Sequence, residues 1–249
     1  MKSLLIGHRG EPETWPENSY QGFEAVLRAG AAYIETDVQI TADGVAVLSH
    51  DPTLAKVTGL KQAIADTEYA VIRALSAGCP GRFGEKYRDF SIARLDEFAA
   101  LLKQWPQARA FVEIKHGSLE AFGIARVIDT VLAVLEEVLA QVIIISFEYE
   151  SLVYTREVSE LPIGWVLPAW SAENRSRAQE LAPEYLFCNV TRLPKVPEPL
   201  WNGPWKWAVY TVNMAGEVAP LLNRGVALIE TDAFSKLSAD LGRRGETRG

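Results

Sequence analysis

The chain has 249 residues, of which 48% are apolar and 23% are charged, and its formal net charge is −7. A chain of this length and composition buries a large core without disulfides or metal staples, which excludes intrinsic disorder. A pI near 5.2 without any basic run argues against a nucleic-acid-binding protein. A small phosphate substrate remains compatible with this charge, because one Arg and one Lys in a pocket can hold it.

Cysteine usage and the N-terminal residues predict a cytoplasmic protein. Cys79 and Cys188 have no paired spacing, which fits a reducing compartment. Only Leu4, Leu5 and Ile6 precede a Gly-His-Arg run, which is too short for the apolar core of a signal peptide. The longest apolar stretch is far below the ~18 residues of a membrane span, so no stable membrane insertion is expected.

Short β-branched runs alternate with helical segments, beginning with a strand at Leu4–Ile6 and a helix at Tyr20–Ala29. The further predicted strands are Tyr33–Ile40, Val45–Leu48, Phe111–Ile114, Val142–Ile145, Ile163–Leu167, Tyr185–Phe187, Trp207–Val212 and Val226–Ile229. The further predicted helices are Leu95–Lys103, Leu119–Val138, Tyr149–Glu157, Arg175–Leu181 and Glu217–Asn223. This alternation predicts an α/β fold, either a TIM (β/α)8 barrel or a doubly wound open sheet.

Nine strands are predicted, one more than a barrel of eight contains. The strands at Tyr33–Ile40 and Val45–Leu48 indicate which one is extra. Only residues 41–44 separate these two strands, whereas a parallel crossover needs about a dozen residues. An Asp-Gly pair between alternating apolar runs predicts an antiparallel hairpin instead. With Asp43 and Gly44 as the central turn residues, Asp37 pairs opposite His50. The return strand then falls outside the count, and eight strands remain for a barrel.

Two segments fit neither the strand pattern nor the helix pattern. Residues 51–90 are long enough to be a small insertion between the hairpin and the rest of the barrel, and their glycines and Pro80 indicate a loop. Residues 242–249 are polar and are expected to form a frayed tail. The chain, 1–249, is predicted to form a single domain.

Charged residues lie on one face of two strands that otherwise look interior. Glu35 and Asp37 are two residues apart, so their side chains leave the same face, and Glu113 and Lys115 repeat this pattern on another strand. A solvated strand edge would explain one such pair but hardly two. Adjacent carboxylates on an inward face repel each other unless a cation or protons intervene. Three carboxylates without a thiol favour a hard cation, Mg²⁺ or Ca²⁺.

Two of the three histidines are expected beside these carboxylates. His8 ends the first strand, and His50 ends the return arm of the hairpin. With Arg9 and Lys115 close by, a pair of histidines indicates acid–base chemistry on an anion. His116 follows Lys115 with the opposite strand parity and is interpreted as a loop residue without a catalytic role.

Short motifs carry or surround all of these residues. In chain order they are His8-Arg9-Gly10, Pro16-Glu17-Asn18-Ser19, Glu35-Thr36-Asp37-Val38, His50-Asp51, Glu113-Ile114-Lys115, Ser146-Phe147, Thr211-Val212-Asn213 and the stretch from Gly225 to Thr231-Asp232. Their identity and order resemble the glycerophosphodiester phosphodiesterase family from residue 8 to residue 232. The resemblance implies a TIM barrel of the phosphodiesterase type, with a small insertion after the second histidine motif.

The resemblance also implies a cofactor and two catalytic groups. The matched metal ligands are Glu35, Asp37 and Glu113, which would hold a divalent cation, Mg²⁺ or Ca²⁺. The matched general acid and base are His8 and His50. These roles agree with the interpretation that the residue types suggest by themselves.

The substrate-binding residues implied by the resemblance surround this centre. Arg9 and Lys115 match the phosphate-binding pair, and Glu17 is expected to orient Arg9 and the surroundings of the metal. Phe147 and Tyr210 are expected to contact the substrate. Tyr210 stands where the family usually has Trp, and Glu230 stands where it more often has an apolar residue, so both departures bear on substrate preference.

Tryptophans gather in the last third of the chain, and two interpretations of them remain open. The simpler one is packing in the core and against helices. The other is an aromatic wall near the mouth of the site that receives the alcohol, choline included, through cation–π contacts. The residues concerned are Trp165, Trp170, Trp201, Trp205 and Trp207, with Tyr210.

The implied activity is hydrolysis of small-molecule glycerophosphodiesters to sn-glycerol 3-phosphate and an alcohol. In the path usual for the family, the glycerol 2-hydroxyl attacks first, and water then opens the resulting cyclic phosphate. One alternative is a lipid-directed relative, a lysophospholipase D or a cyclic-phosphate-forming phospholipase, which predicts an apolar rim or membrane-binding loop. Another is a non-catalytic phosphate-sugar-binding protein, which predicts loss of a histidine or a ligand. The oligomeric state and the alcohol group are not predicted.

Overall fold

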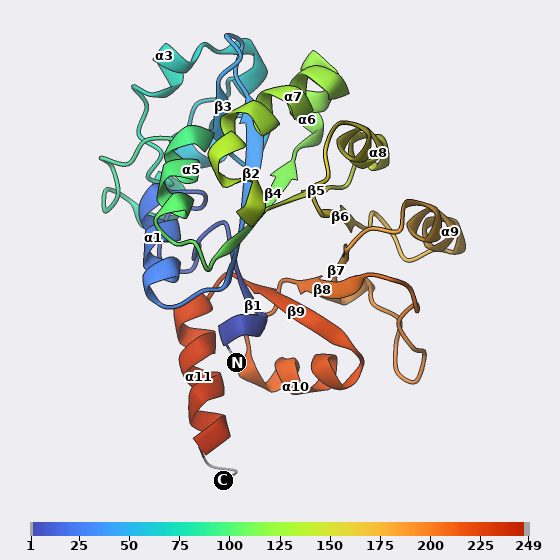
Figure 1. Ribbon diagram of the computed structural model, residues 1–249. Helices are drawn as coiled ribbons and strands as arrows, with labels where there is room; N and C mark the ends of the chain where they lie inside the picture. The colour runs from blue at the N-terminus through green and yellow to red at the C-terminus, as the bar shows by residue number, and fades with distance from the viewer. Residues whose placement is uncertain (1, 247–249) are drawn as a thin grey trace.

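Eight parallel strands close into a barrel in the computed structural model, which describes residues 2–246 (Figure 1). Around the barrel they are β1 (Leu5–His8), β2 (Tyr33–Ile40), β4 (Arg109–Ile114), β5 (Val142–Ser146), β6 (Ile163–Val166), β7 (Tyr185–Asn189), β8 (Lys206–Tyr210) and β9 (Val226–Thr231). Because β1 pairs with both β2 and β9, the sheet has no open edge between them. The predicted TIM (β/α)8 barrel is confirmed, and the doubly wound open sheet is excluded.

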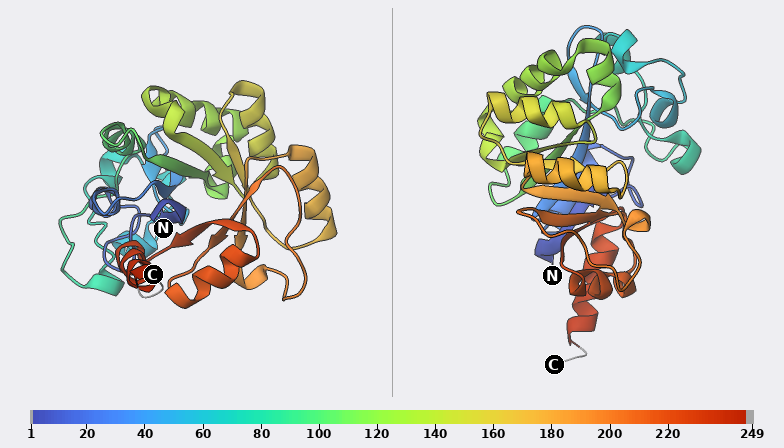
Figure 2. Two further views of the ribbon diagram at one scale, coloured as in Figure 1. Left: turned by 60° about the horizontal axis from the view of Figure 1, so that its bottom comes forward. Right: turned by 90° about the vertical axis from the view of Figure 1, so that its right-hand side faces the viewer.

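Helices cover the outside of the barrel, and Figure 2 shows them from two further sides. They are α1 (Tyr20–Arg28), α5 (Leu95–Lys103), α6 (His116–Phe122), α7 (Ile124–Val134), α8 (Tyr149–Val158), α9 (Ala172–Leu181), α10 (Ala215–Asn223) and α11 (Phe234–Glu246). The single helix predicted over 119–138 is divided, because Gly123 adopts φ +79 between α6 and α7. Within residues 2–246, no helix combines the length and the apolar character that a membrane span requires.

Helix α11 is absent from the predicted elements, although its sequence carries a helical pattern. Phe234, Leu237 and Leu241 recur at intervals of three and four residues and are buried in the core against the barrel. Residues 242–246, expected to be frayed, continue α11 as far as Glu246. Residues 247–249, the rest of the expected tail, lie outside the described residues.

The predicted hairpin is present, but its register differs from the prediction by one residue. Strand β3 (Ala46–Leu48) pairs antiparallel with β2, and the backbone N–H of Ser49 donates to the carbonyl of Asp37 at 3.0 Å. The predicted pairing of Asp37 with His50 is therefore wrong. His50 lies just beyond the paired residues, in the turn that follows β3.

The turn explains this shift. The N–H of Thr41 donates to the carbonyl of Val45, so three residues, 42–44, form the loop in place of two. Gly44 supplies the left-handed position of such a loop, with φ +85. An Asp-Gly pair occurs in both loop lengths, and the choice between them moves every cross-strand partner by one residue.

Alternating side chains of β2 divide between two environments, as predicted. Ile34 and Val38 are fully buried in the core between the barrel and its helices. Glu35 and Asp37 point the other way, toward the barrel interior, where they meet a carboxylate of β4. The two-residue period of the strand thus places the charged pair inside the barrel.

Aromatic rings fill the barrel interior beside these charges. Phe111 of β4 contacts the rings of Tyr185 and Phe187 edge-on, with centroids 5.0 Å apart in both pairs. Two residues further along the same strand and on the same face stands Glu113. The apolar rings therefore close the barrel below the charged residues, which lie nearer the carboxyl ends of the strands.

Residues 51–90, predicted to be an insertion, connect β3 to α5 through short helices. These are α2 (Ala55–Thr58), α3 (Tyr69–Ile72) and α4 (Pro80–Phe83). The segment builds a small apolar core of its own with Val47 of β3. The hydroxyl of Tyr87 donates to the carbonyl of Thr14 at 2.6 Å, which fastens the segment to the loop after β1. Figures 1 and 2 show this cyan segment beside α1.

Candidate active site

Four buried carboxylates converge inside the barrel. Glu35 and Asp37 come from β2, Glu113 from β4 and Glu230 from β9. The pairing of β2 with β4 sets Asp37 directly beside Glu113. Carboxylate oxygens of Glu35, Asp37 and Glu113 lie within 4.8 Å of one another, so the three ligands proposed from the sequence are brought together.

Two cations neutralise part of this charge. Arg9 Nε lies 2.8 Å from Asp37 Oδ2, and Lys115 Nζ lies 2.7 Å from Glu113 Oε1 and 3.2 Å from Asp37 Oδ1. Burial alone would raise the pKa of Asp37, but the charges of Arg9 and Lys115 hold that pKa well below its usual range. Burial likewise opposes the charge of both cations, yet the carboxylates hold the pKa of each above its usual value.

Among residues 2–246, no Lys or Arg forms an ion pair with Glu35, which pairs only with His8. Glu35 is 1% exposed, and among residues 2–246 nothing hydrogen-bonds to its Oε1 atom. Its Oε2 atom accepts from the backbone N–H of Arg9 at 3.2 Å. Burial, and then the charges of Asp37 and Glu230, raise the pKa of Glu35 well above its usual value. An orphaned buried oxygen within a carboxylate cluster fits a ligand of a hard divalent cation.

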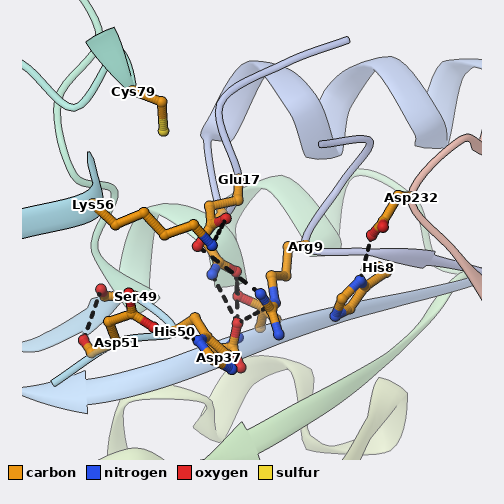
Figure 3. Close-up of polar contacts among 12 residues, drawn as sticks. His8, Arg9, Glu17, Asp37, Ser49, His50, Asp51, Lys56, Cys79 and Asp232 are labelled. Atoms are coloured by element: carbon orange, nitrogen blue, oxygen red, sulfur yellow. Dashed lines mark hydrogen bonds and ion pairs between the residues drawn. The ribbon is translucent and has the colours of Figure 1, made fainter. Parts of the chain in front are cut away.

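His8 reaches the cluster from the end of β1. Its Nδ1 atom lies 2.6 Å from Asp232 Oδ1, a contact drawn as a dashed line in Figure 3. Its Nε2 atom lies 3.3 Å from Glu230 Oε1. Burial opposes ionisation of Asp232, but the hydrogen bond from His8 lowers the pKa of Asp232. An ionised Asp232 accepts from Nδ1–H, which leaves Nε2 directed toward the carboxylates.

His50 reaches the cluster from the opposite side. In Figure 3, His50 lies beside Asp37, whereas His8 lies beyond Arg9. His50 Nδ1 lies 2.7 Å from Asp51 Oδ1, so each histidine has one ring nitrogen held by a carboxylate. Burial, together with the nearby cations, lowers the pKa of His50 despite the opposing charge of Asp37. The structure therefore brings both predicted histidines to the cluster, although the predicted hairpin pairing is wrong.

A cavity of about 220 Å³ opens over this cluster. Its charged lining comes from His8, Arg9, His50, Glu113, Lys115 and Glu230, and its other lining side chains include Ile145, Val166, Phe187, Phe147 and Tyr210. A second groove of about 520 Å³ shares Glu113, Lys115 and Phe147 with this cavity and continues past Glu148 and Arg177. Phe147 and Tyr210, both predicted to contact substrate, thus line the cavity.

The tryptophans follow the packing interpretation. The ring centroids of Trp170 and Trp201 are 4.0 Å apart, and those of Trp170 and Trp207 are 5.5 Å apart. Trp201, Trp205 and Trp207 are buried in the core between the barrel and its helices. These four rings line neither the cavity nor the groove; Trp165 alone of the group reaches the groove.

Comparison with known proteins agrees with this geometry. The model of the family described as "Glycerophosphoryl diester phosphodiesterase family" matches residues 8–236. The chain is 31% identical over 239 residues to a glycerophosphodiester phosphodiesterase of Caldanaerobacter subterraneus subsp. tengcongensis, covering 93% of this chain and 95% of that one. The chain belongs to the glycerophosphoryl diester phosphodiesterase family.

Solved structures of low sequence identity show the same fold. A phosphodiesterase of Oleispira antarctica, in complex with the product sn-glycerol-3-phosphate, superposes with a TM-score of 0.83 at 23% identity and 96% coverage of both chains. A glycerophosphodiester phosphodiesterase of Agrobacterium tumefaciens superposes with a TM-score of 0.75 at 23% identity, covering 95% of this chain and 99% of that one.

Asn18 is a site residue that sequence reasoning missed. Its Nδ2 atom donates to Asp37 Oδ2 at 2.9 Å, and its Oδ1 atom accepts from Thr36 Oγ1 at 3.0 Å. The first of these bonds fixes the Asp37 carboxylate at Oδ2, whereas Lys115 contacts Oδ1. The signal in the sequence is the motif Pro16-Glu17-Asn18-Ser19, of which only Glu17 is predicted to have a role.

Glu17 lies between Arg9 and the insertion. Its Oε1 atom is 3.9 Å from Arg9 Nη1, and its Oε2 atom is 2.5 Å from Lys56 Nζ (Figure 3). Lys56 belongs to α2, so the insertion contributes a charge next to the site. Sequence reasoning could not place Lys56 there, because residues 51–90 showed no pattern that fixes their position.

The end of β9 supplies two further groups that sequence reasoning did not assign to the site. Asp232 holds His8, and Asn213 Oδ1 accepts from the backbone N–H of Asp232 at 2.9 Å. The sequence marks Glu230 as a departure from the family pattern but does not place it in the site. Burial raises the pKa of Glu230 to about 7.

His116 occupies a different environment from the two catalytic candidates. It is the first residue of α6 rather than a loop residue, and its side chain is 66% exposed. Its Nδ1 atom lies 3.0 Å from Glu148 Oε1 at the groove, and it does not line the cavity.

Proposed function

We propose that this chain hydrolyses glycerophosphodiesters to sn-glycerol 3-phosphate and an alcohol, with a divalent cation as cofactor. The observation that carries the proposal is the placement of His8 and His50 on two sides of Arg9, in one cavity that Lys115 also lines. The related Oleispira antarctica phosphodiesterase holds sn-glycerol-3-phosphate as its product, which supports this product for the present chain.

Arg9 and Lys115 bind the phosphate group. Both side chains are engaged with Asp37 and Glu113 in the structure, at distances of 2.7–3.2 Å. Mg²⁺ or Ca²⁺ bound by Asp37, Glu113 and Glu35 would supply positive charge both to these carboxylates and to the developing phosphorane. Arg9 and Lys115 turn their charges to the phosphate oxygens and stabilise the charge that develops in the transition state.

His8 and His50 exchange the protons of the reaction. One imidazole accepts the proton of the attacking hydroxyl, and the other donates a proton to the leaving alkoxide. The nucleophile of the first step is the glycerol 2-hydroxyl, and water opens the cyclic phosphate in the second step. Asp232 and Asp51 accept from the Nδ1 atoms, so each carboxylate stabilises the imidazolium that forms on its histidine.

The two connected hollows accommodate the two arms of a phosphodiester. The cavity of about 220 Å³ holds the glycerol arm beside the histidines, and the groove of about 520 Å³ holds the alcohol. Lys115 borders both, which supports a phosphate position where they meet. Because the groove is the larger and opens past Glu148 and Arg177, we propose that this enzyme accepts more than one alcohol group.

Product analysis over a panel of substrates tests the proposal. Glycerophosphocholine, glycerophosphoethanolamine, glycerophosphoglycerol and a lysophospholipid are incubated with the protein and Mg²⁺ or Ca²⁺, and phosphorus NMR identifies the products. The proposal predicts sn-glycerol 3-phosphate from the three water-soluble diesters. Turnover of the lysophospholipid alone would instead identify the lipid-directed relative, and binding without turnover of any diester would identify a non-catalytic protein.

A further inference from the structure

Glu230 forms its ion pair with His8 and, among residues 2–246, with no Lys or Arg. It is 4% exposed and lines the cavity, with its Oε1 atom 3.3 Å from His8 Nε2. Within residues 2–246, no Lys or Arg forms an ion pair with it, whereas Asp37 and Glu113 are both paired to cations. A buried carboxylate at this position introduces charge that the proposed reaction does not use.

Glu230 belongs to a second group of potential ligands beside the first. Ligand atoms of His8, Glu35 and Glu230 lie within 4.8 Å of one another, and Glu35 is common to this group and to the group with Asp37 and Glu113. Glu35 is also the carboxylate whose buried Oε1 atom lacks a hydrogen-bond partner in the described part of the chain. The two carboxylates of the site that lack a Lys or Arg partner among residues 2–246, Glu35 and Glu230, thus lie together beside His8.

The donor atoms of this second group differ from those of the first. One imidazole nitrogen and two carboxylates suit Zn²⁺, whereas the all-oxygen first group suits Mg²⁺ or Ca²⁺. Asp232, 2.6 Å from His8 Nδ1, is the kind of carboxylate that orients a metal-binding histidine and raises its basicity. Three protein ligands leave a fourth position of a tetrahedral ion open toward the cavity.

We propose that His8, Glu35 and Glu230 form a second cation position, which takes Zn²⁺ in preference to Mg²⁺ or Ca²⁺. Zn²⁺ bound there occupies the lone pair of His8 Nε2, so His8 can no longer exchange a proton with the substrate. The zinc-loaded protein is therefore inactive. This last consequence rests on the proposed function, but the existence of the zinc position does not.

Calorimetric titration of Zn²⁺ into protein saturated with Mg²⁺ tests the position directly. One Zn²⁺ is expected to bind per wild-type chain, and Glu230→Gln is expected to bind it at least about tenfold more weakly. Asp232→Asn, which removes the orienting carboxylate, is expected to weaken zinc binding by about 10–100-fold. Absence of zinc binding to the wild type, or equal affinities of Glu230→Gln and the wild type, would overturn the proposal.

A matched control separates ligation from a general loss of negative charge. Asp51→Asn removes the carboxylate of the other histidine pair, so zinc affinity should remain that of the wild type. Equal weakening in Asp51→Asn and Asp232→Asn would overturn the proposal. Melting temperatures with Mg²⁺ show whether each variant is folded, and His8→Ala provides a second variant that removes a ligand.

The inhibitory consequence has its own measurement. At saturating Mg²⁺, zinc at the concentration that fills the second position should abolish release of glycerol 3-phosphate by the wild type. The fraction of activity that survives the same zinc concentration should be larger in Glu230→Gln. Zinc binding through Glu230 without inhibition of the wild type would overturn the role of His8 in the proposed function, while the calorimetric result would still stand.

Discussion

The two ends of the barrel interior are built from the same strands with opposite chemistry. On β4, Phe111 packs against Tyr185 and Phe187, whereas Glu113, two residues further along the same face, lies among carboxylates. The aromatic end carries no charged side chain among these three rings and packs the barrel interior. The charged end is buried to a similar degree but keeps an orphaned oxygen on Glu35. Function in this molecule therefore occupies a layer that folding alone would not favour.

Removing a histidine from the charged end should have the largest effect. His8→Ala and His50→Ala are each expected to lower kcat by about 10²–10⁴-fold with little change in KM, because proton transfer matters only in the transition state. The double variant should lose less than the product of the two single losses. Steady-state kinetics on glycerophosphocholine measures this.

His116→Ala is the matched control for the histidines, because its side chain is exposed and lies outside the cavity. Its kcat should stay close to that of the wild type. If His116→Ala were as damaging as His50→Ala, the assignment of roles among the histidines would be wrong.

Substitutions two residues apart on β4 should lower stability by very different amounts. Phe111→Ala leaves a cavity and is expected to lower the free energy of unfolding by about 3–5 kcal/mol. Glu113→Gln removes one charge from a crowded cluster, so we expect a much smaller loss, together with weaker binding of Mg²⁺. Chemical denaturation in EDTA and calorimetry measure the two quantities. Similar destabilisation by both changes would remove the distinction between the two ends.

Loss of a phosphate-binding cation should cost less than loss of a proton-transfer group. Lys115→Met is expected to lower kcat/KM by about 10²-fold, because one charge directed at the transition state is lost. It also leaves Asp37 and Glu113 with less compensation, so melting in EDTA should occur at a lower temperature and Mg²⁺ should recover part of the difference. Wild-type efficiency in this variant would mean that phosphate binds elsewhere.

The smallest expected effect is the pH dependence of stability at the charged end. Burial raises the pKa of Glu230 from 4.5 to about 7. The folded protein then keeps a proton that the unfolded chain releases, so this contribution is present at low pH and is lost as pH rises through about 7. In EDTA, wild-type stability should fall more steeply than that of Glu230→Gln between about pH 5 and pH 8. Parallel curves for the two proteins would contradict this assignment.

The sequence predicts the barrel well because its strands and helices are marked by local patterns. The period of β2 places Glu35 and Asp37 inside, and a loop too short for a crossover identifies the hairpin. The register of that hairpin could not be predicted, because a loop of two or three residues can end in the same Asp43-Gly44 pair. In the structure, the backbone hydrogen bond from Thr41 N–H to the carbonyl of Val45 sets this register.

The site residues that the sequence does not predict owe their positions to tertiary structure rather than to a local sequence pattern. Asp232 lies 224 residues from His8 along the chain, and their contact exists only because β9 closes the barrel against β1. Glu230 lies in β9 itself, and its neighbours His8 and Glu35 come from strands that the closing of the barrel brings beside it. Asn18 depends on a loop conformation with φ +56, which no strand or helix period indicates.

The reversible loss of activity on chelation tests the central claim most directly. Release of glycerol 3-phosphate from glycerophosphocholine is followed in one sample through addition of excess EDTA and then of excess Mg²⁺ or Ca²⁺. A carboxylate cluster that needs a cation predicts that turnover stops with EDTA and returns with the cation, and that Glu35→Gln needs a higher cation concentration for the same recovery. Full activity in excess EDTA would contradict the account.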